Sequence, residues 1–204
     1  MNELRKKLGE LDRDNKLRFD EIEKLRPEFT HSIYLANQSP VEEIANSYLN
    51  CVMYAFDLKC DDWYRAIAGN PKVIRKTKSR SKRRNYSIFA DTEFVDYCID
   101  KRLISAISGR EPESGDIVVY SDSERCHHVG KNIPHGRIRS KWGLTDLLEH
   151  KLFEVQDSFG NNVRYFEALG YEQSRCLFTR YAWSVVADDP QTHLLLKTAI
   201  EIQG

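Results

Sequence analysis

The sequence lacks the features that mark secreted, membrane-spanning or disulfide-rich proteins. Its five cysteines, Cys51, Cys60, Cys98, Cys126 and Cys176, are scattered without a repeated short spacing. A disulfide framework is therefore not indicated, and a reducing compartment is the default. No run approaches the length of about 18 apolar residues that a membrane-spanning helix needs. The first residues contain no apolar core of a signal peptide, so we expect a protein that is cytoplasmic or exported by a dedicated secretion system.

Charge of one sign is also missing, because 31 basic residues balance 31 acidic ones over 204 residues. A length of 204 residues predicts one domain with elaborations. One segment departs from the average: residues 72–84 hold eight basic residues and no acidic one. The rest of the chain then has 31 − 8 = 23 basic residues against 31 acidic ones. The segment is either a solvated loop or a docking patch for an acidic or polyanionic partner. Its basic residues are Lys72, Arg75, Lys76, Lys78, Arg80, Lys82, Arg83 and Arg84.

The hydrophobic periodicity changes along the chain from a helical period to a strand period. Apolar residues recur at helical spacing in the first 25 residues, over 41–58, over 92–107 and near the C-terminus. Alternating or β-branched runs bounded by turn residues predict strands at 116–120, 128–133, 137–142, 151–155 and 163–166. Helices followed by a strand meander indicate an α+β fold. We expect a helical arm over 1–40, a core over 41–170 with the basic insertion, and a helical extension packed on the core over 171–204.

Several catalytic signatures are absent from the sequence. It has no phosphate-binding loop, no dinucleotide fingerprint, no GxSxG elbow and no HExxH motif, so nucleotide-dependent and zinc-protease chemistry lose their main support. The run Cys126-His127-His128 is a poor metal site, because consecutive strand residues point to opposite faces. We therefore expect neither a metal nor a cofactor.

Two residues occupy positions that suit thiol chemistry. Asn50 is a strong N-cap residue, and it would make Cys51 the first residue of a helix, where the helix dipole favours a thiolate. The alternative is a buried cysteine acting as a small hydrophobic side chain. His128 opens a predicted strand, and Gly130 leaves space on its face, so His128 is the candidate base. The alternative is a histidine packed in the core or exposed as a polar surface residue.

Four sequence blocks together resemble a known family. They are Asn-Cys followed by Tyr-Ala within 50–55, Gly-Asp-Ile-Val-Val-Tyr at 115–120, His-Val-Gly-Lys at 128–131, and Gly-Arg-Ile-Arg-Ser-Lys-Trp-Gly at 136–143. Their order and spacing are similar to those of NlpC-like, papain-fold cysteine peptidases and amidases. The resemblance covers roughly residues 46–167. It implies a papain-like core in which a nucleophile helix packs on an antiparallel sheet.

The resemblance also implies roles for individual residues. Cys51 would be the nucleophile, His128 the base, and the backbone amide of Cys51 with the Asn46 side chain would hold the oxyanion. The family pattern places the third group at Ser140. His150, which we expect after a short helical stretch from residue 145, is an equal alternative because a second imidazole orients a base more firmly. Asp157, at a turn, ranks behind both.

Two functions from different classes follow. The first is a cysteine-nucleophile hydrolase or acyltransferase acting on a peptide, isopeptide or side-chain amide. Such an enzyme would work in the cytosol or be an effector or toxin delivered by a secretion machine. The second is a catalytically silent papain-like module that binds a protein or polyanionic partner. The distance between Cys51 and His128 discriminates between them.

Overall fold

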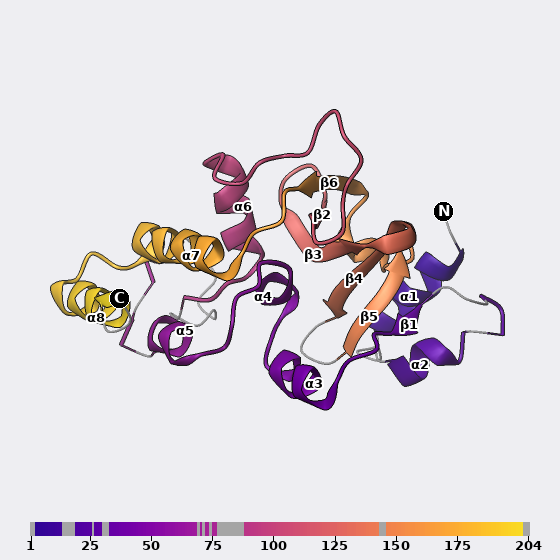
Figure 1. The fold of residues 1–204 in the computed structure, drawn as a ribbon, viewed down its shortest axis with the longest axis horizontal. Helices are drawn as coiled ribbons and strands as arrows, with labels where there is room; N and C mark the ends of the chain where they lie inside the picture. The colour runs from indigo at the N-terminus through magenta and orange to yellow at the C-terminus, as the bar shows by residue number, and fades with distance from the viewer. Residues whose placement is uncertain are drawn as a thin grey trace.

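The computed structural model describes residues 3–13, 19–25, 27–29, 33–68, 70, 72–73, 75–76, 88–142 and 146–201. These residues form an antiparallel sheet with helices on both sides (Figure 1). The α+β class predicted from the sequence is confirmed. The helices are α1 (Glu3–Arg13), α2 (Phe19–Glu23), α3 (Pro40–Ser47), α4 (Cys51–Ala55), α5 (Asp62–Ile67), α6 (Thr92–Asp100), α7 (Tyr171–Val185) and α8 (Pro190–Glu201). The strands are β1 (Tyr34–Leu35), β2 (Ile117–Ser121), β3 (Cys126–Ile133), β4 (Arg137–Trp142), β5 (Asp146–Lys151) and β6 (Asn162–Phe166).

The sheet is a meander with one strand added at each edge. Its strand order is β1-β5-β4-β3-β2-β6, and all pairings are antiparallel. Strands β2 to β5 are neighbours both in sequence and in space, and the short 3-10 turn Pro134–Gly136 joins β3 to β4. β1 pairs with β5. The segment predicted as an N-terminal arm, residues 1–40, therefore contributes a strand to the sheet as well as two helices.

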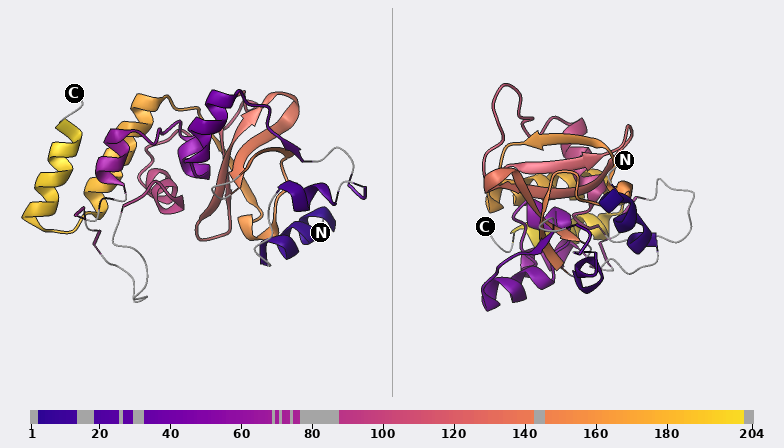
Figure 2. Two further views of the ribbon diagram at one scale, coloured as in Figure 1. Left: turned by 90° about the horizontal axis from the view of Figure 1, so that it is seen from below. Right: turned by 90° about the vertical axis from the view of Figure 1, so that its right-hand side faces the viewer.

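Alternation along the strands divides the side chains between two faces of the sheet. On the first, which we call the α4 face, Val119 lies opposite Val129, and both pack into the core formed with α4, α6 and α7. On the second, the α1 face, Val118 and Tyr120 pack with Leu4 and Leu8 of α1. Figure 2 shows the sheet between the α1–α2 pair and the remaining helices.

The start of α6 matches the sequence prediction, but its end does not. Asp91 caps the helix by accepting hydrogen bonds from the backbone N–H groups of Glu93 and Phe94. The predicted helix over 92–107 was too long, because α6 ends at Asp100 and Arg102 takes a left-handed φ of 53°. That conformation stops a right-handed helix.

Three other predicted elements were wrong. The helix over 41–58 is two helices, because Asn50 takes extended angles (φ −89°, ψ 179°) to cap α4. The helical stretch predicted after residue 145 is strand β5, in which Leu148 packs into the α1-face core while Leu147 points to the other face. The strand predicted over 151–155 is a turn, in which the Glu154 carboxylate accepts the Lys151 N–H.

The basic segment 72–84 lies mostly outside the described residues, and this includes Lys78, Arg80, Lys82, Arg83 and Arg84. Its first part is attached to the body of the protein. Lys72 and Lys76 are exposed, Arg75 pairs with Glu93, and the Lys76 N–H donates to the carbonyl of Val185 at 2.7 Å. Among the described residues, no helix combines the length and the apolar character that crossing a membrane would require.

Candidate functional site

Cys51 stands at the start of α4, as the sequence predicts. The Asn50 side chain accepts the Met53 N–H at 2.8 Å and donates to the Ala90 carbonyl at 2.9 Å. The first bond caps the helix, and the second ties its N-terminus to the segment before α6. The N-cap role of Asn50 is therefore confirmed, and Cys51 is the first helical residue.

The surroundings of the Cys51 sulfur oppose its ionisation. Cys51 is a free, half-buried cysteine packed against the α4-face core. Burial raises the pKa of the Cys51 thiol to about 11, although hydrogen bonds from the backbone N–H groups of Val129, Val52 and Cys51 itself act in the opposite direction. A thiol with a pKa near 11 is almost fully protonated at neutral pH. Cys51 therefore has the position of a nucleophile at the start of a helix, but its thiol is protonated, whereas a nucleophile must be a thiolate.

The structure does not bring His128 to Cys51. His128 lies across from Tyr120 on the α1 face, and its ring stacks on Phe159 with centroids 3.8 Å apart and planes 11° from parallel. Cys51 packs on the opposite face, against Val129. The predicted pairing fails because neighbouring strand residues point to opposite faces, so the residue after His128 faces the thiol and His128 itself does not.

His128 is also unsuited to accept a proton. Burial and the nearby His150 hold the pKa of His128 well below its usual range. Its Nε2 atom is buried and has no hydrogen-bond partner among the described residues. The ring is therefore a neutral core side chain.

Ser140 and His150, the two leading candidates for the third group, are bonded to each other on the α1 face. The His150 Nδ1 lies 2.9 Å from the Lys151 carbonyl, which can only accept, so we assign the proton to Nδ1. Nε2 then accepts from the Ser140 hydroxyl at 2.9 Å, and Ser140 Oγ accepts the Trp142 N–H at 3.0 Å. Burial lowers the pKa of His150 to about 4. The side chains of Ser140, Trp142 and His150 are thus buried and hydrogen-bonded to one another, which is expected of a structural network.

Asp157 and Asn46 lie apart from these groups. Asp157 begins the 3-10 turn Asp157–Phe159 and faces α1, where its carboxylate lies close against Gly9. Asn46, the predicted oxyanion residue, donates from Nδ2 to Gln38 Oε1 at 2.6 Å. Neither contact involves Cys51 or His128.

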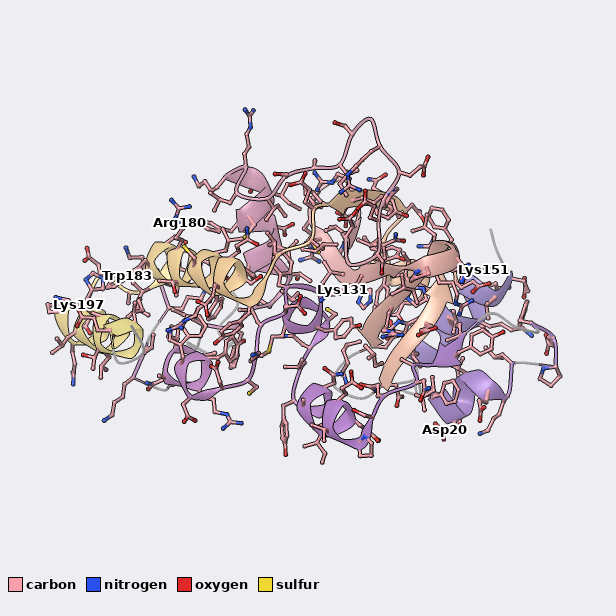
Figure 3. The ribbon with its side chains drawn as sticks, in the orientation of Figure 1. Asp20, Lys131, Lys151, Arg180, Trp183 and Lys197 are labelled. Carbon is pink, nitrogen blue, oxygen red and sulfur yellow. The ribbon has the colours of Figure 1, made fainter. Side chains whose placement is uncertain are left out.

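Charged side chains continue the α4 face beyond Val129. Arg139 and Glu149 are cross-strand neighbours that form an ion pair. Lys131 pairs with Asp57 at the end of α4 and lies 5.5 Å above the centroid of the Tyr54 ring. Figure 3 shows Lys131 between the sheet and α4. The contacts of Lys131 with Asp57 and Tyr54 hold α4 on the sheet.

A polar cleft opens on the same side of the sheet, under α3. It has a volume of about 470 Å³ and lies between α3, the link from β1 to α3, and the adjoining ends of β4 and β5. Lys141 and Leu147, which are cross-strand neighbours, line it from the sheet. Its polar lining also includes Asn37, Gln38, Glu43, Asn46 and Asp146.

A family comparison adds one finding. The model of a domain of unknown function, DUF7689, matches residues 41–167. The chain belongs to the DUF7689 family. The match begins in α3 and ends after β6, so it includes helices α3 to α6 and strands β2 to β6. No curated protein and no solved structure matches the chain.

DUF7689 is a domain of unknown function, so the match assigns no activity, and the resemblance to NlpC-like peptidases stays a prediction. Metal chemistry has no support either, since the described residues contain no group of three or more His, Cys, Asp or Glu side chains able to hold an ion. The sequence reasoning missed the cleft. The alternation of Arg137, Arg139 and Lys141 along β4 indicates a face with basic side chains. The residues of β5 were predicted to be helical, however, and β5 forms part of the wall of the cleft.

Proposed function

We propose that this DUF7689 protein is a papain-like module that binds a protein partner and carries no thiol chemistry. The papain-like description rests on the arrangement of a helix beginning with cysteine, packed on an antiparallel sheet. The absence of thiol chemistry rests on the separation of Cys51 from His128 and on the raised pKa of the thiol. The binding function rests on helix α3.

The single observation that carries the binding function is the orientation of α3. Val41, Ile44 and Tyr48 follow one another at the spacing that forms one stripe of a helix, and such a stripe normally faces the core. Here the three residues are 76%, 66% and 64% exposed, and α3 has no buried residue. The polar residues Glu43 and Asn46 face the cleft instead. An apolar stripe turned to solvent is a feature of interaction surfaces.

Capping signals in the sequence stabilise helix α3, although none of its residues is buried. Ser39 and Glu42 form a capping box, in which the Glu42 N–H donates to Ser39 Oγ and the Ser39 N–H donates to Glu42 Oε2 at 2.8 Å. Pro40 occupies the first helical position, where its fixed φ favours the helix. The helix is therefore preformed, and its apolar stripe is available to a partner.

The binding function is tested by placing a photo-crosslinking amino acid at residue 44 and, as a matched control, at Leu194, which is 64% exposed on α8. A partner identified by mass spectrometry from the residue-44 crosslink is then purified and its affinity measured. We expect Ile44→Glu to weaken this affinity at least about tenfold while leaving the unfolding midpoint unchanged. A partner whose affinity is the same for the variant would contradict the proposal.

A second candidate function is acyl transfer through Cys51 alone. The observation that favours it is the set of three backbone N–H groups around the sulfur, which would stabilise a thiolate or an oxyanion. It ranks second because burial outweighs these bonds. Alkylation with iodoacetamide separates the two candidates: the binding module predicts that Cys51 reacts at least about tenfold more slowly than the exposed Cys176. A faster Cys51 would favour the enzyme.

A further inference from the structure

The two edges of the sheet differ, because one is bonded to a further segment of the chain and the other is open. At the first edge, the Ile107 N–H donates to the carbonyl of Tyr165 in β6 at 2.9 Å, and the Glu167 N–H donates to the Ser105 carbonyl at 3.0 Å. At the second edge lies β1, and among the described residues no strand pairs with its outer side. An open edge presents backbone groups with which another chain can pair.

The register of β1 shows which backbone groups point outward. Ala36 continues the pairing of β1 with β5, and its N–H donates to the Leu147 carbonyl at 2.9 Å. In an antiparallel pair, alternate residues direct their backbone groups to the neighbouring strand. The N–H and the carbonyl of Leu35, one residue earlier, therefore point away from the sheet. No described residue is bonded to these two groups, and Leu35 is 51% exposed.

The cleft lies beside this edge, between β1 and α3. Its volume of about 470 Å³ is within the range of about 300–1,000 Å³ that ligand pockets occupy. Its lining follows the chain over residues 35–38 and includes Glu43, Asn46 and Ser47 of α3. A groove beside an open strand edge suits an extended peptide that adds to the sheet, because backbone bonds supply affinity and side chains directed into the groove supply specificity.

Alternation along an added strand would place its side chains in two different surroundings. Leu35 lies opposite Leu148, which packs in the α1-face core. A residue paired with Leu35 would therefore direct its side chain to the α1-face side and pack against the exposed Leu35, so it should be apolar. Its two neighbours would point to the other side of the sheet, where Ala36 and the cleft lie.

The charge that the cleft offers to a ligand is negative. Lys141 and Asp146 attract each other, and Asp146 Oδ2 also accepts the Phe19 N–H at 3.2 Å, so both side chains interact within the protein. Glu43 is exposed, and no described residue forms an ion pair with it. A basic side chain that enters the cleft would meet the Glu43 carboxylate.

We infer that an extended segment of the partner adds to the sheet beside β1, with an apolar residue paired with Leu35 and basic neighbours directed into the cleft toward Glu43. The inference rests on the proposed function, because it names the part of the partner that the binding module would recognise. The apolar stripe of α3 would contact the partner next to this segment.

Two peptides of opposite charge test the chemistry of the segment. Acetyl-Ala-Lys-Val-Lys-Ala amide has one valine between two basic residues, and acetyl-Ala-Glu-Val-Glu-Ala amide is its acidic counterpart. Binding is followed through the backbone amide signals of Leu35 and Ser47 in two-dimensional NMR spectra. We expect the lysine peptide to bind at least about threefold more tightly and to slow the hydrogen exchange of the Leu35 N–H. Equal affinities, no binding, or unchanged exchange at Leu35 would overturn the inference.

Methylation of the peptide backbone tests whether the peptide binds as a strand. The valine N–H should donate to the Leu35 carbonyl, whereas the N–H groups of the two lysines should point to solvent. N-methylation at the valine should weaken binding at least about fivefold, and N-methylation at the lysine that follows it should leave the affinity unchanged. The same affinity for both methylated peptides would contradict strand addition.

A substitution in β1 tests the same bond from the side of the protein. Leu35→Pro removes the outward N–H and leaves the bond between Ala36 and Leu147 in place, since proline is tolerated where an edge N–H faces solvent. We expect this variant to bind the lysine peptide at least about fivefold more weakly than Leu35→Val, which keeps the N–H. Equal binding by the two variants would contradict the inference.

A charge reversal in α3 keeps the inference testable if the proline variant does not fold. Glu43→Lys changes an exposed residue and should invert the order of the two peptides, so that the glutamate peptide binds more tightly. Glu10→Lys, at an exposed position of α1, changes the net charge equally and should leave the order as it is. A glutamate peptide that remains the weaker ligand of Glu43→Lys would contradict the inference.

The outcomes separate this inference from the proposed function. Strand addition fails alone when Ile44→Glu weakens the affinity of the crosslinked partner but the lysine peptide does not bind. The proposed function fails alone when Ile44→Glu leaves that affinity unchanged while the lysine peptide still binds at Leu35, in which case the sheet edge and not α3 is the binding surface.

Discussion

The two faces of the sheet divide between them the groups that a thiol enzyme needs together. The α4 face holds a thiol surrounded by backbone N–H groups, and the α1 face holds the imidazoles of His128 and His150. On the α4 face, the Lys131–Asp57 ion pair fastens the end of α4 to the sheet, and the Arg139–Glu149 ion pair joins two neighbouring strands. On the α1 face, the imidazoles of His128 and His150 are neutral and buried. His128 and Val129 are adjacent in sequence, yet their side chains lie on opposite faces of the sheet, and only Val129 is on the side of the thiol.

The difference extends to accessibility. The α1 face is covered by α1, whose Leu4 and Leu8 are buried and whose Arg5 donates to the Gly160 carbonyl at 2.5 Å. The α4 face is covered by α4 near Val129, but toward Lys141 it opens into the cleft. The α4 face is therefore open to solvent at the cleft, whereas the α1 face is buried beneath α1.

The largest effect is expected from Phe159→Ala on the α1 face. The Phe159 ring stacks on His128 and contacts Tyr120 and Trp142. Its removal leaves a cavity among these rings, and we expect a loss of about 3–5 kcal/mol in the free energy of unfolding, measured by urea titration. Phe153→Ala is the control, since Phe153 is 44% exposed. Equal losses for the two variants would show that the α1 face is not a packed core.

Acid should destabilise the protein through the same face. The unfolded chain protonates a histidine near pH 6.5, whereas folded His150, with its pKa lowered to about 4, stays neutral over that range. Its contribution is thus fully present above about pH 6.5 and is lost as the pH falls toward about 4, which amounts to about 2 kcal/mol between about pH 7 and 5. His150→Gln keeps a donor and an acceptor and should reduce this loss. The measurement is urea unfolding at both pH values, and an unchanged pH dependence in the variant would contradict the assignment.

A smaller effect is expected on the α4 face from Asn50→Ala. The substitution removes the cap of α4 and the bond to the Ala90 carbonyl, so we expect a loss of about 1–2 kcal/mol in thermal or urea unfolding. Asn50→Asp keeps the cap acceptor and should lose less. Equal losses for the two substitutions would mean that the cap bond contributes little.

Local signals in the sequence predicted a large part of the fold. Asn50 was recognised as a cap because a short polar side chain before an apolar run has that role. Strand β4 was predicted with its observed ends because turn residues bound it. β5 was missed, since Asp146-Leu147-Leu148-Glu149 also has helical character and only its pairing with β4 decides between the two structures.

The candidate site was predicted less well, and for a physical reason. The position of Cys51 depends on a local cap, which the sequence contains. The direction of His128 depends on strand phase, which its pairing with Tyr120 of β2 sets. The cleft forms where α3, β4 and β5 lie side by side, and no sequence motif predicts that these three elements are neighbours.

The most direct test of the central claim is the pKa of the Cys51 thiol in the wild-type protein and in His128→Phe. It can be measured from the pH dependence of iodoacetamide alkylation at Cys51, with the reacted residue identified by mass spectrometry. The account predicts a pKa above about 10 that does not change in the variant, because His128 lies on the opposite face from the sulfur. A pKa below about 7.5 that rises when His128 is replaced would contradict it.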